Sequence, residues 1–319
     1  MIVARRTSKL LLHFSSMSSI TDRVRDRISS IAANRKITHE APRLKEIIDT
    51  IKNVNYRYDF PQGLLDEQKK KMKRFDVFRF NPMESDEPPH FASYYIDPSE
   101  YHMKFLDVLI KIKDEIDPTL SFRRSCREGI CGCCSMNIDG RQTLACITEV
   151  PMNNLNKSFI APLTCMNTLK DLVVDLSHFY IQYKSIQPYL KRRTLRESKD
   201  KEYYQSIEDR AKIDGLYECV LCLSCSASCP SYWWRPNEYL GPAVLLQALR
   251  WLIDSRDEYR DERLEALGGD LKLSECFQLG VCSMTCPKGL DPRAAIEEID
   301  NLYKEYADRK SRQASTIQI

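Results

Sequence analysis

The sequence has few glycines and no long apolar run. Glycine supplies only 10 of the 319 residues, which excludes collagen-like and glycine-rich low-complexity proteins. No apolar stretch approaches the ~20 residues that a membrane-spanning helix needs, so we expect a protein that is soluble or bound to a membrane surface. The chain also lacks a Gly-rich dinucleotide fingerprint, a P-loop and a Gly-x-Ser-x-Gly elbow. It therefore shows no signature of nucleotide binding or of a hydrolase nucleophile.

Acidic residues are absent from the first 20 positions, where serine recurs and basic residues flank an apolar run. This composition is typical of a mitochondrial transit peptide, and we predict a transit peptide and disordered arm over residues 1–36. A disordered basic arm alone is the alternative. Residues 1–40 hold eight basic and three acidic residues, an excess of five positive charges, whereas the whole chain has a net charge of +3. Because the remainder is slightly acidic, we expect no nucleic-acid partner.

The pattern of apolar and charged residues predicts an α+β fold with four segments after the arm. They are an N-terminal extension and linker (37–73), a domain with strands (74–178), a linker helix region (179–210) and a helical domain (211–319). The extension holds one amphipathic helix pattern and then a charged tract. A second charged run, 191–202, is expected at a solvent-exposed boundary between the domains.

Alternating apolar residues predict the elements of the first domain. A strand beginning at Phe75 has a hairpin partner at 91–96, and apolar residues three and four apart predict a helix over 105–116. The Asp-Gly pair after residue 138 predicts a hairpin between 135–138 and 143–147.

Helices are expected to dominate after about residue 170. We predict one within 175–190, one capped by Gly215, one over 244–253 with Pro242 in its first turn, and a last one opening at Asp291.

Thirteen cysteines lie between Cys126 and Cys286, mostly in three tight groups, which indicates metal binding rather than a disulfide scaffold. The first group has the C-x4-C-x2-C spacing with a distant fourth cysteine that is typical of a plant-type [2Fe–2S] site. Its ligands are Cys126, Cys131, Cys134 and Cys146.

Four other observations bear on the first group. Zinc is the competing metal, although structural zinc sites favour C-x2-C pairs separated by longer intervals. Cys133 is interpreted as a neighbour that does not bind metal, since its use would break the spacing. Cys165 stands alone and is interpreted as a small buried hydrophobic residue. Three arginines, Arg123, Arg124 and Arg127, are expected to offset the negative charge of the site.

The second and third groups belong together. Residues 219–230 form the run C-x2-C-x2-C-x3-C-P, in which the fourth cysteine binds the other cluster of a two-cluster protein. Residues 276–287 repeat this run with Leu279 at the second place. Exchange of fourth ligands predicts a [4Fe–4S] cluster on Cys219, Cys222, Cys225 and Cys286. Only Cys229, Cys276 and Cys282 remain for the other cluster, and three thiolates favour [3Fe–4S].

Three different clusters without a substrate signature predict a chain of one-electron carriers that serves catalytic partners. At this point the residues resemble a known family. From about Phe75 to Tyr303 the chain resembles the iron–sulfur subunit of mitochondrial succinate dehydrogenase (respiratory complex II) and its fumarate reductase relatives. The segments that carry the resemblance are Arg123 to Gly132, Gly215 to Cys219, Cys229 to Trp234 and Tyr239 to Val244.

The resemblance implies a plant-type ferredoxin-like β-grasp domain, followed by an all-α domain like a bacterial ferredoxin. It implies electron transfer from succinate through FAD on a partner flavoprotein, and then through the three clusters to ubiquinone, within the tricarboxylic acid cycle and the respiratory chain. The implied partners are that flavoprotein, two membrane-anchor cytochrome b subunits and iron–sulfur assembly factors. The implied place is the matrix side of the mitochondrial inner membrane, as a peripheral subunit. The implied quinone-binding residues are Pro230, Ser231, Trp233 and Trp234. For Trp233, anchoring of the domain is the alternative role.

Several residues depart from the family pattern. Phe277 stands where the family usually has histidine near the quinone. The short motifs that recruit assembly factors read Val-Phe-Arg at 77–79 and Leu-Ser-Glu at 273–275. Cys133 replaces a small residue and Cys165 replaces a common histidine. These departures leave two alternatives open: a fumarate reductase subunit, and a non-catalytic assembly or decoy paralogue.

Overall fold

The computed structural model describes residues 72–83, 88–100, 102–151, 157–194, 202–268 and 272–317. The chain divides into two compact units, Met1–Asp175 and Leu176–Ile319. The predicted transit peptide and the helix within the extension lie outside the described residues. The five domain limits given above remain predictions. Among the described residues, no helix combines the length and the apolar character needed to cross a bilayer.

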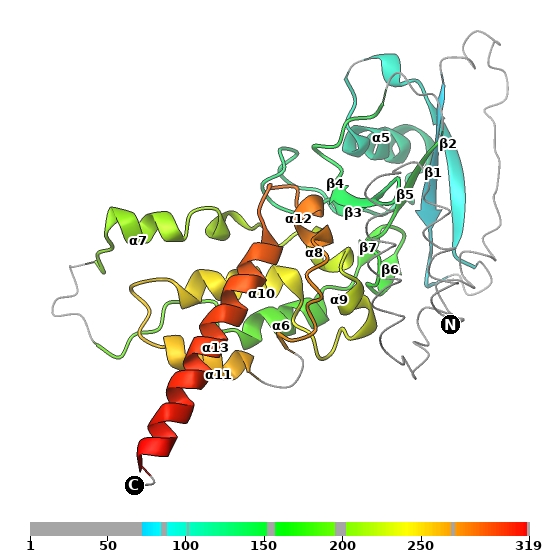
Figure 1. The fold of residues 1–319 in the computed structure, drawn as a ribbon. Helices are drawn as coiled ribbons and strands as arrows, with labels where there is room; N and C mark the ends of the chain where they lie inside the picture. Colours follow the sequence, from blue (N-terminus) through cyan, green and yellow to red (C-terminus); the bar gives the residue numbers. More distant parts are fainter. Residues whose placement is uncertain are drawn as a thin grey trace. The chain divides into compact units, whose positions relative to one another are not determined.

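The first unit is built on a five-stranded mixed sheet (Figure 1). Its strands are β1 (Lys73–Arg79), β2 (His90–Ile96), β3 (Ser135–Ile138), β4 (Arg141–Leu144) and β5 (Ser158–Ala161). They lie in the order β2-β1-β5-β3-β4, with β1 and β5 parallel and the other pairs antiparallel. A separate two-stranded sheet is formed by β6 (Thr168–Lys170) and β7 (Val173–Val174).

One helix covers the apolar side of this sheet. It comprises α5 (Phe105–Lys111), continued by a π-helical turn at Ile112–Ile116, and a short 3-10 turn at Pro98–Glu100 precedes it. Phe75 of β1 and Phe105 of α5 are both buried, and their rings meet edge to face with centroids 6.1 Å apart. The apolar spacing that predicted this helix therefore forms the contact between the helix and the sheet.

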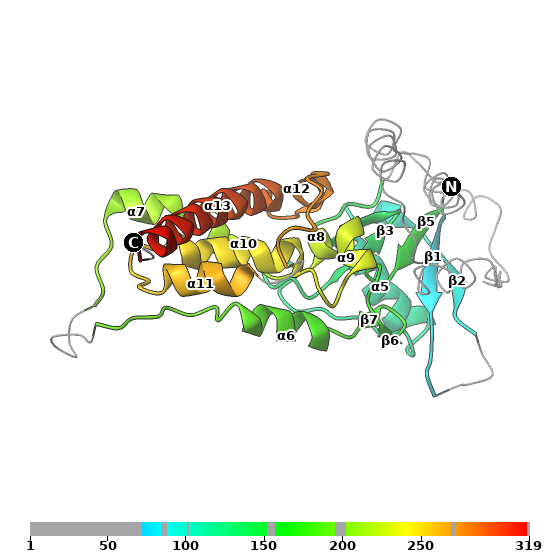
Figure 2. The same cartoon turned by 60° about the horizontal axis from the view of Figure 1, so that its bottom comes forward.

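The second unit is helical. Its helices are α6 (Ser177–Ser185), α7 (Ile207–Lys212), α8 (Ser224–Ala227), α9 (Pro230–Trp234), α10 (Gly241–Leu252), α11 (Arg260–Leu267), α12 (Val281–Thr285) and α13 (Pro292–Ile317), with a 3-10 turn at Leu216–Glu218. Almost every residue of α10 is buried, because α8, α11 and α13 pack around it (Figures 1 and 2). The α+β fold predicted from the sequence is confirmed.

Several predicted elements differ in extent. The strand expected over 143–147 ends at Leu144, and residues 145–147 form a turn. The helix expected within 175–190 ends at Ser185, because Gln187 has a φ of +50° and Pro188 follows it. The strands β5, β6 and β7 were not predicted.

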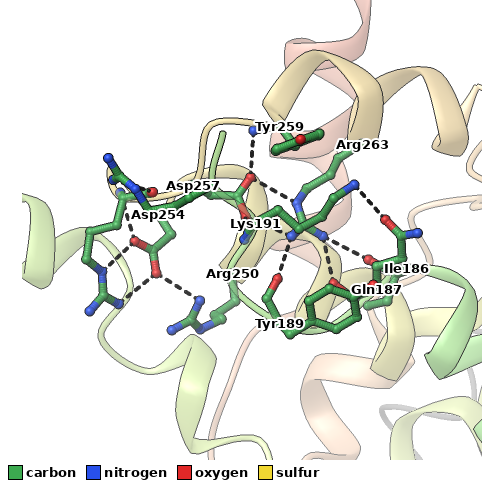
Figure 3. A network of polar contacts seen from close by, with 11 residues as sticks. Ile186, Gln187, Tyr189, Lys191, Arg250, Asp254, Asp257, Tyr259 and Arg263 are labelled. Carbon is green, nitrogen blue, oxygen red and sulfur yellow. Dashed lines mark hydrogen bonds and ion pairs between the residues drawn. The ribbon is translucent and has the colours of Figure 1, made fainter. Parts of the chain in front are cut away.

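A polar network joins the segment after α6 to α10 and α11 (Figure 3). Arg263 and Asp257 form a buried ion pair, with Nη2 and Oδ2 2.8 Å apart and side chains that are 6% and 0% exposed. The same guanidinium donates to three backbone carbonyls at 2.7–2.9 Å, those of Ile186, Gln187 and Tyr189. Lys191, which opens the charged run 191–202, donates its backbone N–H to Asp257 at 3.0 Å.

We expect Asp257→Ala to lower the free energy of unfolding by about 3 kcal/mol, because it leaves the buried Arg263 guanidinium without its counter-charge. The midpoint of thermal unfolding of the cluster-loaded protein, followed by circular dichroism, measures the effect. The control is Glu265→Ala, which breaks an exposed pair with Lys310 (2.7 Å) and should cost less than about 1 kcal/mol. Equal midpoints for the two variants would contradict the prediction.

Candidate functional site

The first group of cysteines is brought together by a loop and a hairpin. Cys126, Cys131 and Cys134 lie in the loop before β3, and Cys146 lies in the turn after β4. β3 and β4 pair with Ser135 opposite Leu144, so Cys134, one residue before Ser135, and Cys146, two residues after Leu144, lie at the same end of the hairpin. The hairpin turn at Asp139 and Gly140 has positive φ at both residues, as predicted.

Backbone N–H groups surround the sulfur of Cys126. Those of Glu128, Ile130 and Cys131 each lie 3.4 Å from it, and the N–H of Cys126 lies 3.5 Å from the sulfur of Cys131. The backbone hydrogen bond from Glu128, with those of its neighbours, lowers the pKa of Cys126 to about 6. The loop thus stabilises the thiolate, which is the form that binds metal.

Glycine at position 129 lets the loop approach the turn that carries Cys146. Gly129 has a φ of +77°, and a Cβ there would lie 2.9 Å from Cγ2 of Ile147. Cys134 is buried in this region, and burial raises the pKa of its thiol to about 12, with Cys146 and Cys131 close by. The four predicted ligands therefore form one neighbourhood.

Two cysteines that are not among the predicted ligands, Cys133 and Cys165, lie near or after this site and are at least partly exposed. Cys133 is exposed, and its thiol points to the Cys131 carbonyl at 3.8 Å. Cys165 was expected to be buried, but it is partly exposed in a turn after β5 with a φ of +63°. That expectation was wrong, because a single residue in a turn carries no periodicity from which burial can be judged.

The second group lies around α8. Leu221 and Leu223 take positive φ and turn the chain between successive cysteines. Burial, with the nearby thiols of Cys222 and Cys219, raises the pKa of Cys225 well above its ordinary value. Cys286 lies close enough to Cys219 and Cys222 to contribute to the raised pKa of both thiols. Cys286, from the second run of the sequence, therefore lies beside the three cysteines of the first run. This is the neighbourhood that exchange of fourth ligands requires.

The third group lines a small pocket that is partly open to solvent. Its walls carry Cys229, Cys276 and Cys282 together with Leu279. Burial raises the pKa of Cys229 to about 11 and that of Cys282 to about 12. Leu279 has no group that binds iron, so the pocket offers three thiols.

Two buried polar atoms of this pocket's lining residues have no hydrogen-bond partner of ordinary geometry among the described residues. They are the hydroxyl of Tyr239 and Oε1 of Gln278. Burial, with the adjacent thiols of Cys229 and Cys276, raises the pKa of Tyr239 well above its ordinary value, so its hydroxyl stays protonated. Sequence reasoning assigned no role to Tyr239, although it belongs to one of the segments that carry the resemblance.

Only two of the four predicted quinone-binding residues line the pocket of the third group. Pro230 and Ser231 line the pocket of the third group, as does Phe277. Trp233 and Trp234 do not line it. The indole N–H of Trp233 donates to the Ala227 carbonyl at 2.6 Å, which fits the anchoring role.

The three groups of cysteines supply the kind of ligand that iron–sulfur clusters require. Each site supplies three or four cysteine sulfurs, and the first adds backbone N–H groups directed at sulfur. Among the described residues, no group of three or more His, Cys, Asp or Glu side chains is arranged to hold a single metal ion.

Comparison with known proteins agrees with this interpretation. Residues 74–181 match the family model of a 2Fe-2S iron-sulfur cluster binding domain, and residues 218–291 match that of a 4Fe-4S dicluster domain. A chain of the Mycobacterium smegmatis Sdh1 complex in the apo form matches with a TM-score of 0.62 at 20% identity, covering 75% of this chain and 97% of that one. A hypothetical protein from Helicobacter pylori matches with a TM-score of 0.45 at 17% identity, covering 75% of this chain and 42% of that one.

The two domains and the thiol sites within them define an iron–sulfur electron-transfer subunit. In its fold the chain is similar to a chain of the Mycobacterium smegmatis Sdh1 complex, and its two cluster-binding domains lie in the order predicted from the sequence. The family resemblance inferred from the sequence is thereby confirmed at the level of domains and fold.

Proposed function

We propose that the chain is the iron–sulfur subunit of a succinate:ubiquinone oxidoreductase at the matrix face of the mitochondrial inner membrane. One observation carries the proposal: of the seven cysteines in the helical unit, only three line the pocket of the third group, and an apolar Leu279 lies beside them. Three clusters, when bound, supply one-electron steps between a two-electron donor and a distant acceptor. This arrangement suits a chain that links a flavoprotein to a quinone.

The residues of each site have defined roles in this proposal. The [2Fe–2S] cluster is held by Cys126, Cys131, Cys134 and Cys146, the [4Fe–4S] cluster by Cys219, Cys222, Cys225 and Cys286, and the [3Fe–4S] cluster by Cys229, Cys276 and Cys282. Pro230, Ser231 and Trp234 bind ubiquinone, and Trp233 braces α9 through its bond to Ala227. The loop N–H groups around Cys126 stabilise added negative charge.

The partners follow from this function. A flavoprotein with FAD delivers electrons from succinate, two membrane-anchor cytochrome b subunits hold the subunit at the membrane, and iron–sulfur assembly factors load it. The Sdh1 match supports this proposal, because that protein was solved as part of a complex. The basic, acid-free first 20 residues support mitochondrial import.

Low-temperature EPR with iron and sulfide analysis tests the proposal on the anaerobically purified complex. We expect about nine iron atoms per chain, a three-iron signal in the oxidised protein, and two further cluster signals after reduction. Zinc, or fewer irons in a folded complex, would favour the assembly or decoy paralogue. A fumarate reductase would show the same clusters but would turn over faster in the direction of fumarate reduction.

Phe277 gives a test of the quinone side. It lines the pocket beside Ser231 but offers no polar group to a quinone carbonyl. We expect Phe277→His to lower the KM for ubiquinone about two- to tenfold, the effect of one added hydrogen bond. Succinate-dependent reduction of a soluble dye should not change.

Phe277→Leu is the matched control, because it changes the shape of the side chain without adding a donor. If Phe277→His and Phe277→Leu give the same quinone kinetics, this placement of Phe277 is wrong. If the wild-type complex reduces the dye but not quinone, its transfer of electrons to quinone is impaired, which would support the assembly or decoy alternative.

A further inference from the structure

The hydroxyl of Tyr239 faces the sulfurs of the third site. Tyr239 is completely buried, and it lines the same pocket as Cys229, Cys276 and Cys282. Its hydroxyl lies against the sulfur of Cys276, within reach of a hydrogen bond to it, and makes no hydrogen bond with any other described residue. A polar group in a fully enclosed position is thus directed at the thiols.

The backbone holds Tyr239 firmly in this position. Its N–H donates to the Arg235 carbonyl at 3.0 Å, and its carbonyl accepts from Nε2 of Gln182 at 3.1 Å. Just beyond it, Gly241 has a φ of +81°, and a Cβ there would lie 2.8 Å from the ring of Tyr232. The backbone on both sides of Tyr239 is therefore held in place, and the complete burial of its side chain keeps the hydroxyl out of contact with water.

Such a hydroxyl needs a partner. A buried polar group without a hydrogen bond costs about 1–3 kcal/mol, and folded proteins rarely leave one unpaired. A phenol donates through its O–H. The other unpaired atom of these lining residues, Oε1 of Gln278, is an acceptor. The pocket lining also contains the Ser231 hydroxyl and the sulfurs of Cys229, Cys276 and Cys282, and sulfurs become strong acceptors when they carry negative charge.

We propose that the Tyr239 hydroxyl donates a hydrogen bond to a sulfur of the cluster bound by Cys229, Cys276 and Cys282, and thereby raises the reduction potential of that cluster. The inference rests on the proposed function. Reduction adds one electron to the cluster, so the hydrogen bond is stronger in the reduced state and favours it. Tyr239 then acts as a tuning residue that favours arrival of the electron at the last carrier.

A redox titration of the three-iron EPR signal in the intact complex tests the proposal. In Tyr239→Phe we expect about a tenfold lower ratio of reduced to oxidised cluster at the wild-type midpoint potential, with iron content and signal amplitude retained. Tyr232→Phe is the matched control. It removes another buried tyrosine hydroxyl, which donates to Oε1 of Gln182 at 2.9 Å, and should leave the ratio unchanged.

An unchanged ratio in Tyr239→Phe, or an equal change in both variants, overturns the proposal. If Tyr239→Phe fails to retain the cluster, a ring-fluorinated tyrosine at position 239 takes its place. Its hydroxyl is a stronger donor, so the ratio should rise, and an unchanged ratio again overturns the proposal. Absence of a three-iron signal in the wild type would overturn the proposed function itself, which separates that failure from the failure of this inference.

Discussion

Replacing Leu279 by cysteine is expected to convert the three-iron cluster into a four-iron cluster. Leu279 occupies the second place of the cysteine run 276–286 and lies on the wall of the pocket that holds the three thiols. A fourth thiolate at this place completes the ligand set for a fourth iron. We expect the oxidised three-iron EPR signal of Leu279→Cys to disappear and the iron content to rise from about nine to about ten atoms per chain.

Leu279→Ala is the control for this experiment, since it removes the side chain without supplying a ligand. It should keep the three-iron signal and about nine irons. Retention of the three-iron signal in a fully loaded Leu279→Cys protein would mean that position 279 does not face the open corner of the cluster.

Removing Cys286 is expected to abolish the [4Fe–4S] cluster and leave the [3Fe–4S] cluster in place. Cys286 belongs by sequence to the same run as Cys276 and Cys282, yet its thiol lies near Cys219, Cys222 and Cys225. In Cys286→Ala the EPR signal of the reduced four-iron cluster should be lost, together with electron transfer from succinate to quinone. The oxidised three-iron signal should persist.

Cys282→Ala provides the reciprocal measurement. It should remove the three-iron signal and retain the four-iron signal. If each run of cysteines bound its own cluster, both variants would lose the three-iron signal and keep the four-iron signal, and exchange of ligands would be refuted.

The parts of the fold that the sequence predicted are those with local patterns. The helix α5, the hairpin at Asp139 and Gly140, and the helix α13 each have a period or a turn signal within their own residues. The strand β5 has only four residues and pairs in parallel with β1, some 80 positions away in the chain. Such a non-local pair leaves no local signal. The strand predicted over 143–147 lies at 141–144, because the apolar residues of this segment continue into the turn that carries Cys146.

The residues of the candidate sites also differ in whether the sequence could predict them. The cysteine groups follow from spacing, because a metal ligand has to recur at fixed intervals in a loop. The contribution of Tyr239 does not, because Tyr239 and Cys276 meet only after α10 and α11 have folded between them. The unpaired hydroxyl becomes visible only when burial and neighbours are known atom by atom.

The order of the ligands along the chain turns the two clusters of the helical unit into cross-links. With the proposed ligands, each cluster joins residues 219–229 to residues 276–286 and closes the segment with α10 and α11 into a loop. Closing about 50 residues in this way restricts the unfolded chain by an amount worth about 4 kcal/mol. Loading with iron is then a step of folding. Oxidative loss of a cluster would reopen the loop and expose the buried face of α10 to proteases.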